Sequence, residues 1–377
     1  MKLGIDAFNI SSGGGLTHLK EFISAARPEE YGFTKVYLWG SAELLNKIKN
    51  KRWLVKLNEP FLNKNLFFRL YWHKFKSKSH FINKNCDIIL TPGGISLSGF
   101  KPNVTMCRNM LPFEWLELFR YGLSIKAIKL ILLRFLQIQS FKKADGLIFL
   151  SKYAKKIVTK FIPTKKPNFV TIPHGVNPIF FKISSKKNKS YLSSKQTIRL
   201  IYISNISPYK HHLNVVKAIH QVRKSGLSIE IDLVGKKEEG MPLLNRYLKR
   251  YDPKNEFVFI DGAVEYEHLH YRISKADIGI FASSCENLPN ILLEKMASGL
   301  PIACSNMGPM PEILGNAGKY FNPLCANDIE LAIKKLISSK KLREKLGKKA
   351  KLHASLYTWG KCADNTLRFL SKTTKQI

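Results

Sequence analysis

The sequence predicts an α/β protein built from two Rossmann-like domains. Its 377 residues are about twice the length of a single domain. Short apolar, β-branched runs alternate with helical patterns along most of the chain, which is typical of parallel βαβ units. Hydrophobic residues make up 45% and charged residues 24% of the sequence, so the composition indicates an ordered globular protein.

The β-branched runs form two series on either side of a polar segment. That segment is rich in Lys and Ser and has no periodicity, so we expect a linker over residues 183–197. The domains then span residues 1–182 and 198–356, with a final segment at residues 357–377. Strands are expected near residues 3–8, 35–39, 87–90, 104–107, 146–150 and 169–172, and again near residues 199–204, 228–234, 256–260, 277–281 and 301–304.

Two doubly wound sheets in tandem are expected to face each other across a cleft. Ligands of such sheets bind beyond the carboxyl ends of the strands, so functional residues should lie in the loops that follow strands. Gly13, Gly14 and Gly15 follow the first strand and open a helical pattern, where bare backbone can approach a phosphate or a sugar. The same glycines would also suit a tight turn without a ligand, because the pattern is not GxGxxG.

The net charge is the unusual feature of the composition. Lys and Arg number 62 and Asp and Glu number 27, which gives a formal charge of +35 and favours anionic partners. Residues 51–85 interleave basic and aromatic side chains, and residues 118–143 are expected to form a basic helix with apolar positions. This combination suits an anionic membrane surface, although single-stranded nucleic acid could also use it and part of both stretches could pack inside.

Several common sites and signals are not expected. Six cysteines are spread out with no CxxC pair, so we expect neither a zinc site nor a disulfide framework, and a reducing cytoplasm fits. No Asp-x-Asp pair occurs, so no divalent metal is expected. The N-terminus reads as a strand and not as a signal peptide, and no apolar run reaches the length of a membrane span.

A lysine follows the first strand of the second series. The strand near residues 199–204 leads into Asn205 and then Lys210, and a helical pattern starts at His212. A lysine in such a loop can neutralise a diphosphate as a point charge. In a chain with so many lysines, an ordinary surface position is the alternative.

The most specific pattern lies between residues 284 and 301. Glu286 falls in the loop after the apolar strand near residues 277–281, Pro289 suits the first turn of a helix, and Glu294 lies on that helix. The backbone amides of Asn287, Leu288 and Asn290 form a helix N-terminus that can receive an anion. Two carboxylates on either side of an anion site suit a ligand with hydroxyl groups on both sides of a diphosphate, which is a nucleotide sugar.

These residues together resemble a known enzyme family. The E-x7-E pair of Glu286 and Glu294, the segments at residues 296–301 and 308–312, Lys210 and the glycine loop are similar to retaining GT-B glycosyltransferases of family 4, also called glycosyl transferases group 1. The resemblance covers nearly the whole chain and is densest in residues 199–322. It implies the GT-B fold, with a last helix near Trp359 to Leu370 that crosses back to the N-terminal domain.

The resemblance also implies roles for individual residues. Glu286 would contact hydroxyls of the donor sugar, Glu294 the ribose and Lys210 the diphosphate, while Gly14 and Gly15 let the N-terminal domain close on the donor. The family usually has an Arg where this chain has Asn205, and many members have His-Asp where this chain has Arg108-Asn109. Arg108 is therefore expected to bind acceptor or phosphate, or alternatively to pair with Glu114 or Glu117. Residues 174–177 resemble the family's hinge between domains.

The expected protein is a metal-independent, retaining hexosyltransferase. Its donor would be a UDP- or GDP-linked sugar and its acceptor a lipid-linked saccharide, in the synthesis of a bacterial surface polysaccharide such as O-antigen or capsule. No cofactor or metal is expected. The location would be cytoplasmic, peripheral on the inner face of the plasma membrane. A soluble transferase for a small acceptor and a single-stranded nucleic-acid-binding protein are the alternatives.

Overall fold

The computed structural model describes residues 1–162, 168–183 and 197–376, which divide into two compact units. The first unit comprises residues 1–113, 123–175 and 358–377, and the second comprises residues 114–122 and 176–357. The first unit therefore ends seven residues before the expected limit at residue 182, and a short segment from the first half of the chain groups with the second unit. Most of the expected linker, residues 184–196, lies outside the described residues.

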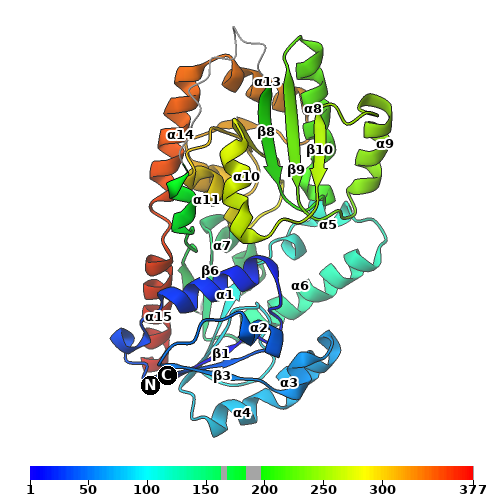
Figure 1. Ribbon diagram of the computed structural model, residues 1–377. Helices are drawn as coiled ribbons and strands as arrows, with labels where there is room; N and C mark the ends of the chain where they lie inside the picture. Colours follow the sequence, from blue (N-terminus) through cyan, green and yellow to red (C-terminus); the bar gives the residue numbers. More distant parts are fainter. Residues whose placement is uncertain (163–167, 184–196, 377) are drawn as a thin grey trace. The chain divides into compact units, whose positions relative to one another are not determined.

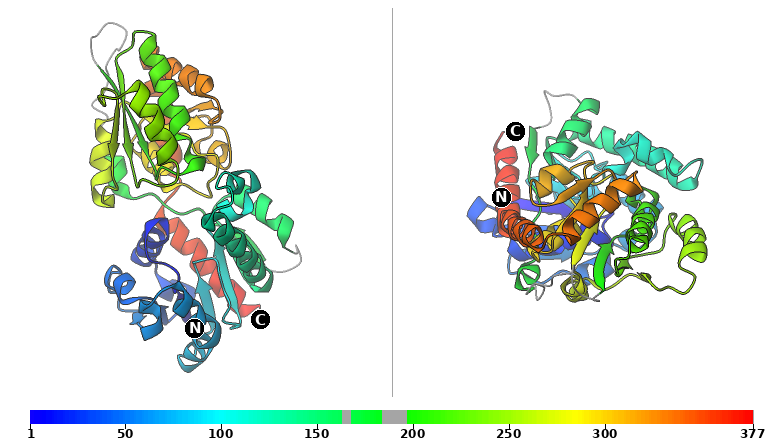
Figure 2. Two further views of the ribbon diagram at one scale, coloured as in Figure 1. Left: turned by 90° about the vertical axis from the view of Figure 1, so that its right-hand side faces the viewer. Right: turned by 90° about the horizontal axis from the view of Figure 1, so that it is seen from above.

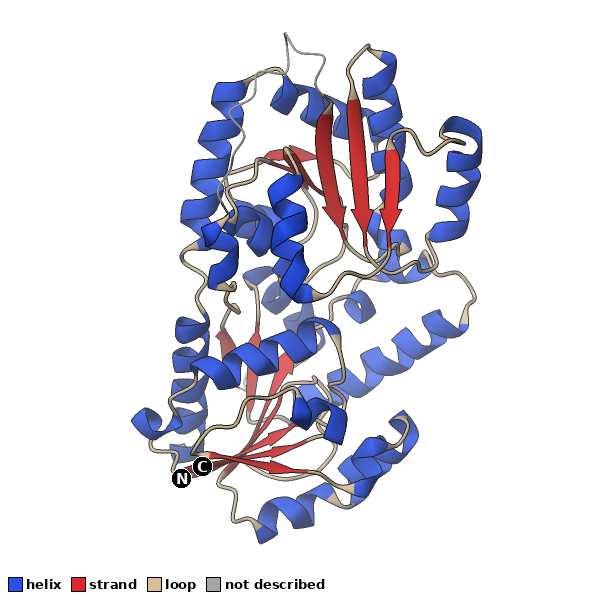
Figure 3. Ribbon diagram, viewed as in Figure 1, coloured by secondary structure: helices blue, strands red, loops and turns tan. Residues whose placement is uncertain are grey.

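The first unit contains a seven-stranded sheet with all neighbouring strands parallel, in the order β3-β2-β1-β4-β5-β6-β7. Its helices cover both faces of the sheet (Figure 3). The strands are β1 (Lys2–Asp6), β2 (Lys35–Trp39), β3 (Leu54–Leu57), β4 (Ile88–Thr91), β5 (Asn103–Cys107), β6 (Gly146–Phe149) and β7 (Asn168–Thr171). The helices are α1 (Gly13–Ala25), α2 (Ala42–Asn46), α3 (Leu66–Phe75), α4 (Ser77–Asn83), α6 (Ile125–Lys143), α7 (Lys152–Val158) and α15 (Trp359–Lys375).

The second unit contains a six-stranded parallel sheet in the order β10-β9-β8-β11-β12-β13. Helices α8 and α9 lie on one face of it and α10 on the other (Figure 1; Figure 2, left). The strands are β8 (Ile198–Ile203), β9 (Ile229–Val234), β10 (Val258–Asp261), β11 (Ile278–Phe281), β12 (Ile302–Ser305) and β13 (Lys319–Phe321). The helices are α5 (Trp115–Phe119), α8 (His212–Lys224), α9 (Met241–Tyr251), α10 (Leu269–Lys275), α11 (Asn290–Ala297), α12 (Met310–Leu314), α13 (Ala326–Ile337) and α14 (Lys340–Ala354).

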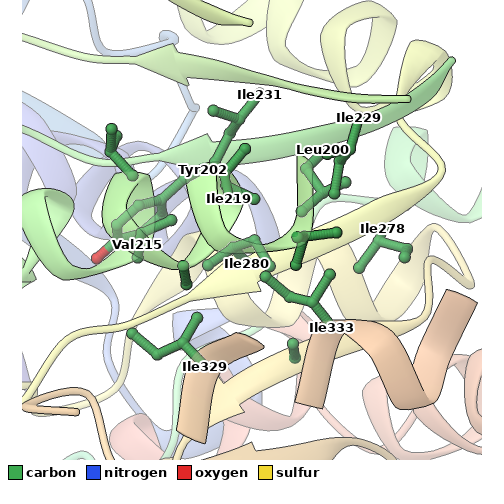
Figure 4. Packing of buried hydrophobic residues seen from close by; sticks show 14 of the residues in the cluster. Leu200, Tyr202, Val215, Ile219, Ile229, Ile231, Ile278, Ile280, Ile329 and Ile333 are labelled. Carbon is green, nitrogen blue, oxygen red and sulfur yellow. The ribbon is translucent and has the colours of Figure 1, made fainter. Parts of the chain in front are cut away.

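The core of the second unit is built by the side chains that the sequence pattern placed on one face. Val215, Val216, Ile219 and Val222 of α8 are fully buried, at the helical spacing expected from the sequence. They pack between the apolar residues of β8, β9 and β11 and the buried face of α13 (Figure 4). This apolar layer holds the strands in place and so fixes where the loops at their carboxyl ends begin.

The C-terminal helix α15 belongs to the first unit and packs against α1 (Figure 1). Thr358 caps its first turn, because its side chain accepts a hydrogen bond from the amide of Lys361. Trp359, Cys362 and Ala363 are buried, and Thr366, Leu367 and Leu370 continue the same face with helical spacing. Helix α15 thus groups with the strands and helices of the first unit.

Two strands and one helix differ from the sequence expectation. Strands β3 and β13 were not expected, because both are short, half-buried edge strands without a continuous apolar run. The helix expected over residues 118–143 begins only at Ile125, where Ser124 caps it by accepting a hydrogen bond from the amide of Ala127.

The aromatic residues of the segment 51–85 differ in burial. Trp72 and Phe81 lie in the core, whereas Phe67, Tyr71 and Phe75 are exposed.

Candidate functional site

The strand order of the second sheet places Lys210 and Glu286 at one point. Lys210 follows β8 and Glu286 follows β11, and these two strands are parallel neighbours, with Leu200 of β8 opposite Ile278 of β11. The strand order reverses between β8 and β11, which is where open parallel sheets bind ligands. The topology therefore brings the two side chains together at the ligand-binding edge.

Lys210 and Glu286 form an ion pair in which the Nζ atom of Lys210 donates to Oε1 of Glu286. Both side chains are largely buried. Burial opposes the positive charge of Lys210, but the carboxylate of Glu286 outweighs it and the pKa of Lys210 is raised. The Tyr202 hydroxyl donates to the backbone oxygen of Lys210 at 2.7 Å and fixes the turn. The site thus holds a permanently charged ammonium group at neutral pH.

Asn205 lies beside a carboxylate that the sequence did not single out. Its side-chain amide donates to Oε1 of Glu238 at 2.8 Å, and its side-chain oxygen accepts from the amide of Lys236 at 3.3 Å. Ser207 donates to the other oxygen of Glu238. These contacts occupy the Asn205 side chain with protein partners, and sequence patterns gave no signal for Glu238 because its contacts depend on the neighbouring strand β9.

The loop from Asn287 to Asn290 leads into helix α11. Asn287 and Leu288 are buried. We expected Pro289 in the first helical turn, and it lies one position earlier, as the N-cap residue. Leu292, Leu293 and Met296 of α11 are fully buried, which anchors the helix with its N-terminus directed toward the Glu286 loop. The N-terminal end of the helix carries partial positive charge and can act with Lys210 on an anion.

Glu294 is a buried carboxylate on α11 that is only 2% exposed. The Tyr266 hydroxyl hydrogen-bonds to it, but among the described residues its Oε2 atom has no hydrogen-bond partner. Burial raises the pKa of Glu294 to about 7, against the opposing effects of Tyr266 and Lys295. A buried acceptor without a donor is costly in the free protein and suits a ligand hydroxyl group.

Lys295 is a second lysine at the site, and the sequence analysis did not identify it. It is fully buried, and its Nζ atom donates to the backbone oxygen of Ile280 at 2.7 Å, at the end of β11. The rings of Tyr202 and Phe281 lie 5.5 and 5.8 Å from that nitrogen. Burial lowers the pKa of Lys295 to about 7. A lysine beside the apolar residues of a helix is normally exposed to solvent. The sequence pattern therefore does not predict that Lys295 is buried.

In the first unit, Arg108 holds the glycine loop. Helix α1 begins at Gly13, and the guanidinium group of Arg108, just after β5, donates to the backbone oxygens of Gly14 and Gly15. Burial lowers the pKa of Arg108 to about 10, so it stays protonated at neutral pH. Glu117, one of the two acids considered as a partner of Arg108, accepts a hydrogen bond from Arg120 at 2.7 Å.

The expected hinge segment coincides with a change of unit. The first unit ends at Gly175 and the second resumes at Val176. A side chain at position 175 would come within 2.2 Å of the backbone nitrogen of Trp359, so only glycine fits there. The ring of His174 stacks on Trp359 at 5.6 Å, which gives this histidine a structural contact.

Among the described residues, no group of three or more His, Cys, Asp or Glu side chains is arranged to hold a metal ion. Within the described part of the chain, every helix falls short of the length and apolar character needed to cross a bilayer.

Residues 184–353 match the family model of the glycosyl transferases group 1. The matched segment contains Lys210, Glu286 and Glu294, together with the strands that position them. An Escherichia coli protein named O-antigen chain mannosyltransferase B is 28% identical over 106 residues, which is 28% of this chain and 28% of that protein. Alignments with the curated relatives cover between 20% and 64% of those proteins' own length.

Solved structures match the chain over nearly its whole length. Sucrose-phosphate synthase from Thermosynechococcus elongatus has a TM-score of 0.78 at 16% identity and covers 100% of both chains. Anabaena Alr3699/HepE in complex with UDP and glucose has a TM-score of 0.72 at 14% identity, over 98% of this chain and 99% of that one. At these identities the likeness concerns the fold, which is the GT-B fold expected from the sequence.

The buried carboxylate of Glu294 leads to a prediction about stability. Its pKa of about 7 in the folded protein exceeds its ordinary value of 4.5, so the folded state binds more protons than the unfolded state between these pH values. The free energy of unfolding should therefore fall as the pH rises from about 4.5 to about 7. Replacing Glu294 with Gln should remove most of this fall and stabilise the ligand-free protein at pH 8 by about 2 kcal/mol.

Urea unfolding at a series of pH values measures this effect. Glu344→Gln, on the exposed side of α14, is the matched control and should leave the pH profile unchanged. If the free energy of unfolding of Glu294→Gln depends on pH as that of the unsubstituted protein does, Glu294 is not a buried carboxylate with a raised pKa.

Proposed function

We propose that this protein is a retaining glycosyltransferase that moves a hexose from a UDP- or GDP-linked sugar to a lipid-linked saccharide. The observation that carries the proposal is the Lys210–Glu286 ion pair at the switch point of the second sheet. One partner offers a positive charge for a diphosphate, and the other offers a carboxylate for sugar hydroxyls. Glu294, whose buried Oε2 atom has no hydrogen-bond partner in the part of the chain that the structure describes, supplies the third contact.

The proposed binding mode follows from the charges of these groups. The diphosphate binds between Lys210 and the N-terminal end of α11, where an ammonium group and helix amides both favour negative charge. Glu294 accepts a hydrogen bond from a ribose hydroxyl. When the phosphate engages Lys210, Glu286 loses its internal partner and can accept from hydroxyls of the donor sugar.

Catalysis in this proposal is electrostatic. Negative charge develops on the diphosphate as the sugar departs, and Lys210 with the helix amides stabilises that charge without reorganisation. These groups supply the role of a divalent cation, so the reaction is proposed to be metal-independent. Arg108 contributes by holding the backbone of the glycine loop at the start of α1, and it acts as a positioning residue.

The named relatives support the nature of the donor and of the product. The Anabaena structure contains UDP and glucose, and the Escherichia coli relative is named for O-antigen synthesis. For this chain we extend these to a nucleotide-sugar donor and to a bacterial surface polysaccharide.

Exposed apolar side chains of the first unit support a membrane location. On α3, Phe67, Tyr71 and Phe75 are 74%, 41% and 61% exposed, and Lys74 lies 5.1 Å from the ring of Phe75. An aromatic surface among lysines fits the interface of an anionic bilayer. A second apolar row lies on α6, where four residues at helical spacing are each more than half exposed: Ile125, Ile128, Leu132 and Phe135.

The role of Lys210 is tested by separating nucleoside from diphosphate binding. A panel of UDP-, GDP- and ADP-sugars first identifies the donor by transfer or slow hydrolysis, with and without EDTA. Lys210→Ala should then weaken binding of the nucleoside diphosphate by about 10- to 100-fold, because a charged hydrogen-bond partner is lost, and leave binding of the nucleoside nearly unchanged.

Lys224→Ala, at the exposed end of α8, is the matched control and should bind both ligands normally. Equal losses for nucleoside and diphosphate in Lys210→Ala would show that this lysine does not face the diphosphate. Absence of binding or hydrolysis with every sugar of the panel would count against the transferase itself.

The membrane location predicts salt-sensitive binding to anionic vesicles. Replacing Lys74, Lys76 and Lys78 with Gln should release the protein, since each basic residue near an anionic surface contributes about 1 kcal/mol. Transfer to a soluble acceptor should remain. Replacing the same number of lysines on α14 (Lys341, Lys345 and Lys348) removes equal charge elsewhere and should have a smaller effect. Tight binding to single-stranded DNA at 0.3 M salt, without vesicle binding at any salt, would contradict the membrane location.

A further inference from the structure

Two loops that are far apart in sequence are hydrogen-bonded to each other beside the Lys210–Glu286 pair. The backbone amide and the hydroxyl of Ser284 both donate to the backbone oxygen of Tyr209, at 3.0 and 3.1 Å. The ring nitrogen Nε2 of His211 lies 2.8 Å from the same Ser284 hydroxyl, and the contact is buried. Lys210 and Glu286 are thus each one or two residues from this cluster of contacts.

The direction of the His211 hydrogen bond follows from counting hydrogens. A serine hydroxyl has one hydrogen to donate, and a backbone carbonyl can only accept. Because the Ser284 hydroxyl donates to Tyr209, the Nε2 atom of His211 must carry a hydrogen and donate to Ser284. Burial, together with the charge of Arg120, lowers the pKa of His211 to about 4, so the ring is neutral at neutral pH.

The backbone of His211 adopts an unfavourable conformation to make this contact. Its φ and ψ angles are 51° and 34°, in the left-handed region that L-residues with a side chain rarely occupy. The residue also stands at the junction of the Lys210 turn and helix α8, where it is the N-cap. Glycine would adopt this backbone more easily, but it could not donate to Ser284.

We propose that His211 is a positioning residue that holds the Glu286 loop at a fixed distance from Lys210. It does so by donating to Ser284, which lies two residues before Glu286. His211 itself directly follows Lys210 in the chain. The proposal rests on the proposed transferase function only for its kinetic consequence. We call the contacts of Ser284 with His211 and Tyr209 the clamp. The clamp is a property of the free protein and can be measured without a substrate.

Three substitutions separate the imidazole contact from the backbone conformation. His211→Gly and His211→Asn both favour the left-handed backbone but place no donor at the Nε2 position. His211→Gln keeps a side-chain N–H of similar reach while it disfavours that backbone as histidine does. His220→Gln is the matched control, because His220 is a half-buried histidine of the same unit that hydrogen-bonds to Tyr247 and not to the site.

The first measurement is hydrogen exchange of the Ser284 amide in the ligand-free protein, read from peptides that contain this residue. In His211→Gly and His211→Asn this amide should exchange at least tenfold faster than in the unsubstituted protein. In His211→Gln and His220→Gln it should stay protected. Equal protection in all variants would overturn the proposal, because the clamp would then not depend on the imidazole.

The second measurement is the rate of transfer from the donor that the panel identifies. His211→Gly should lower kcat by about tenfold with a small change in the KM for the acceptor, and added imidazole should restore part of the loss by filling the cavity. His211→Gln should retain most of the activity. Loss of activity in His211→Gly that imidazole does not restore, with Ser284 still protected, would overturn the proposal. If the unsubstituted protein transfers no sugar, the proposed function fails, and the exchange result alone decides the clamp.

Discussion

The ion pair between Lys210 and Glu286 depends on the sheet beneath it more than on the two loops that carry these residues. Their ion pair exists because β8 and β11 are neighbours at the point where the strand order reverses. The apolar layer between α8, the sheet and α13 fixes where these strands end. Ligand-free, the pair keeps both charges satisfied. In the proposed function, a diphosphate replaces the carboxylate as the partner of Lys210 and releases Glu286 for the sugar.

Several groups at this edge of the sheet are held in states that cost stability. Glu294 has a buried oxygen without a donor among the described residues, Lys295 is a fully buried lysine, and His211 has a left-handed backbone. Each would be unfavourable in an ordinary core. All three lie near the carboxyl ends of β8 and β11, so the proposed ligand would meet these groups at one edge of the sheet.

The sequence could predict most of the fold because its strands are apolar runs closed by loops. The two missed strands, β3 and β13, are short edge strands without such runs. Within the site, the positions of Lys210 and Glu286 after strands and of Glu294 on the next helix could be predicted, but their contacts could not. Whether Lys210 pairs with Glu286, or Asn205 with Glu238, depends on which strands are neighbours.

Burial was the other property that sequence patterns could not decide. Lys295 follows Glu294 on a helix, and only the packing of α11 on β11 shows that its ammonium group is buried. The aromatic residues of 51–85 look alike in sequence, yet Trp72 lies in the core and Phe67 in solvent. Helical phase separates the two only once the start of α3 is known, because a shift of one residue turns the face by about 100°.

The exchange of partners by Lys210 is tested most directly by the affinity for the nucleoside diphosphate that the unsubstituted protein binds, measured by calorimetry. Four proteins are compared: unsubstituted, Lys210→Met, Glu286→Gln and the double variant. The account predicts that Glu286→Gln binds at least as tightly as the unsubstituted protein, that Lys210→Met binds about tenfold or more weakly, and that the double variant resembles Lys210→Met. A loss of affinity in Glu286→Gln as large as that in Lys210→Met would contradict it.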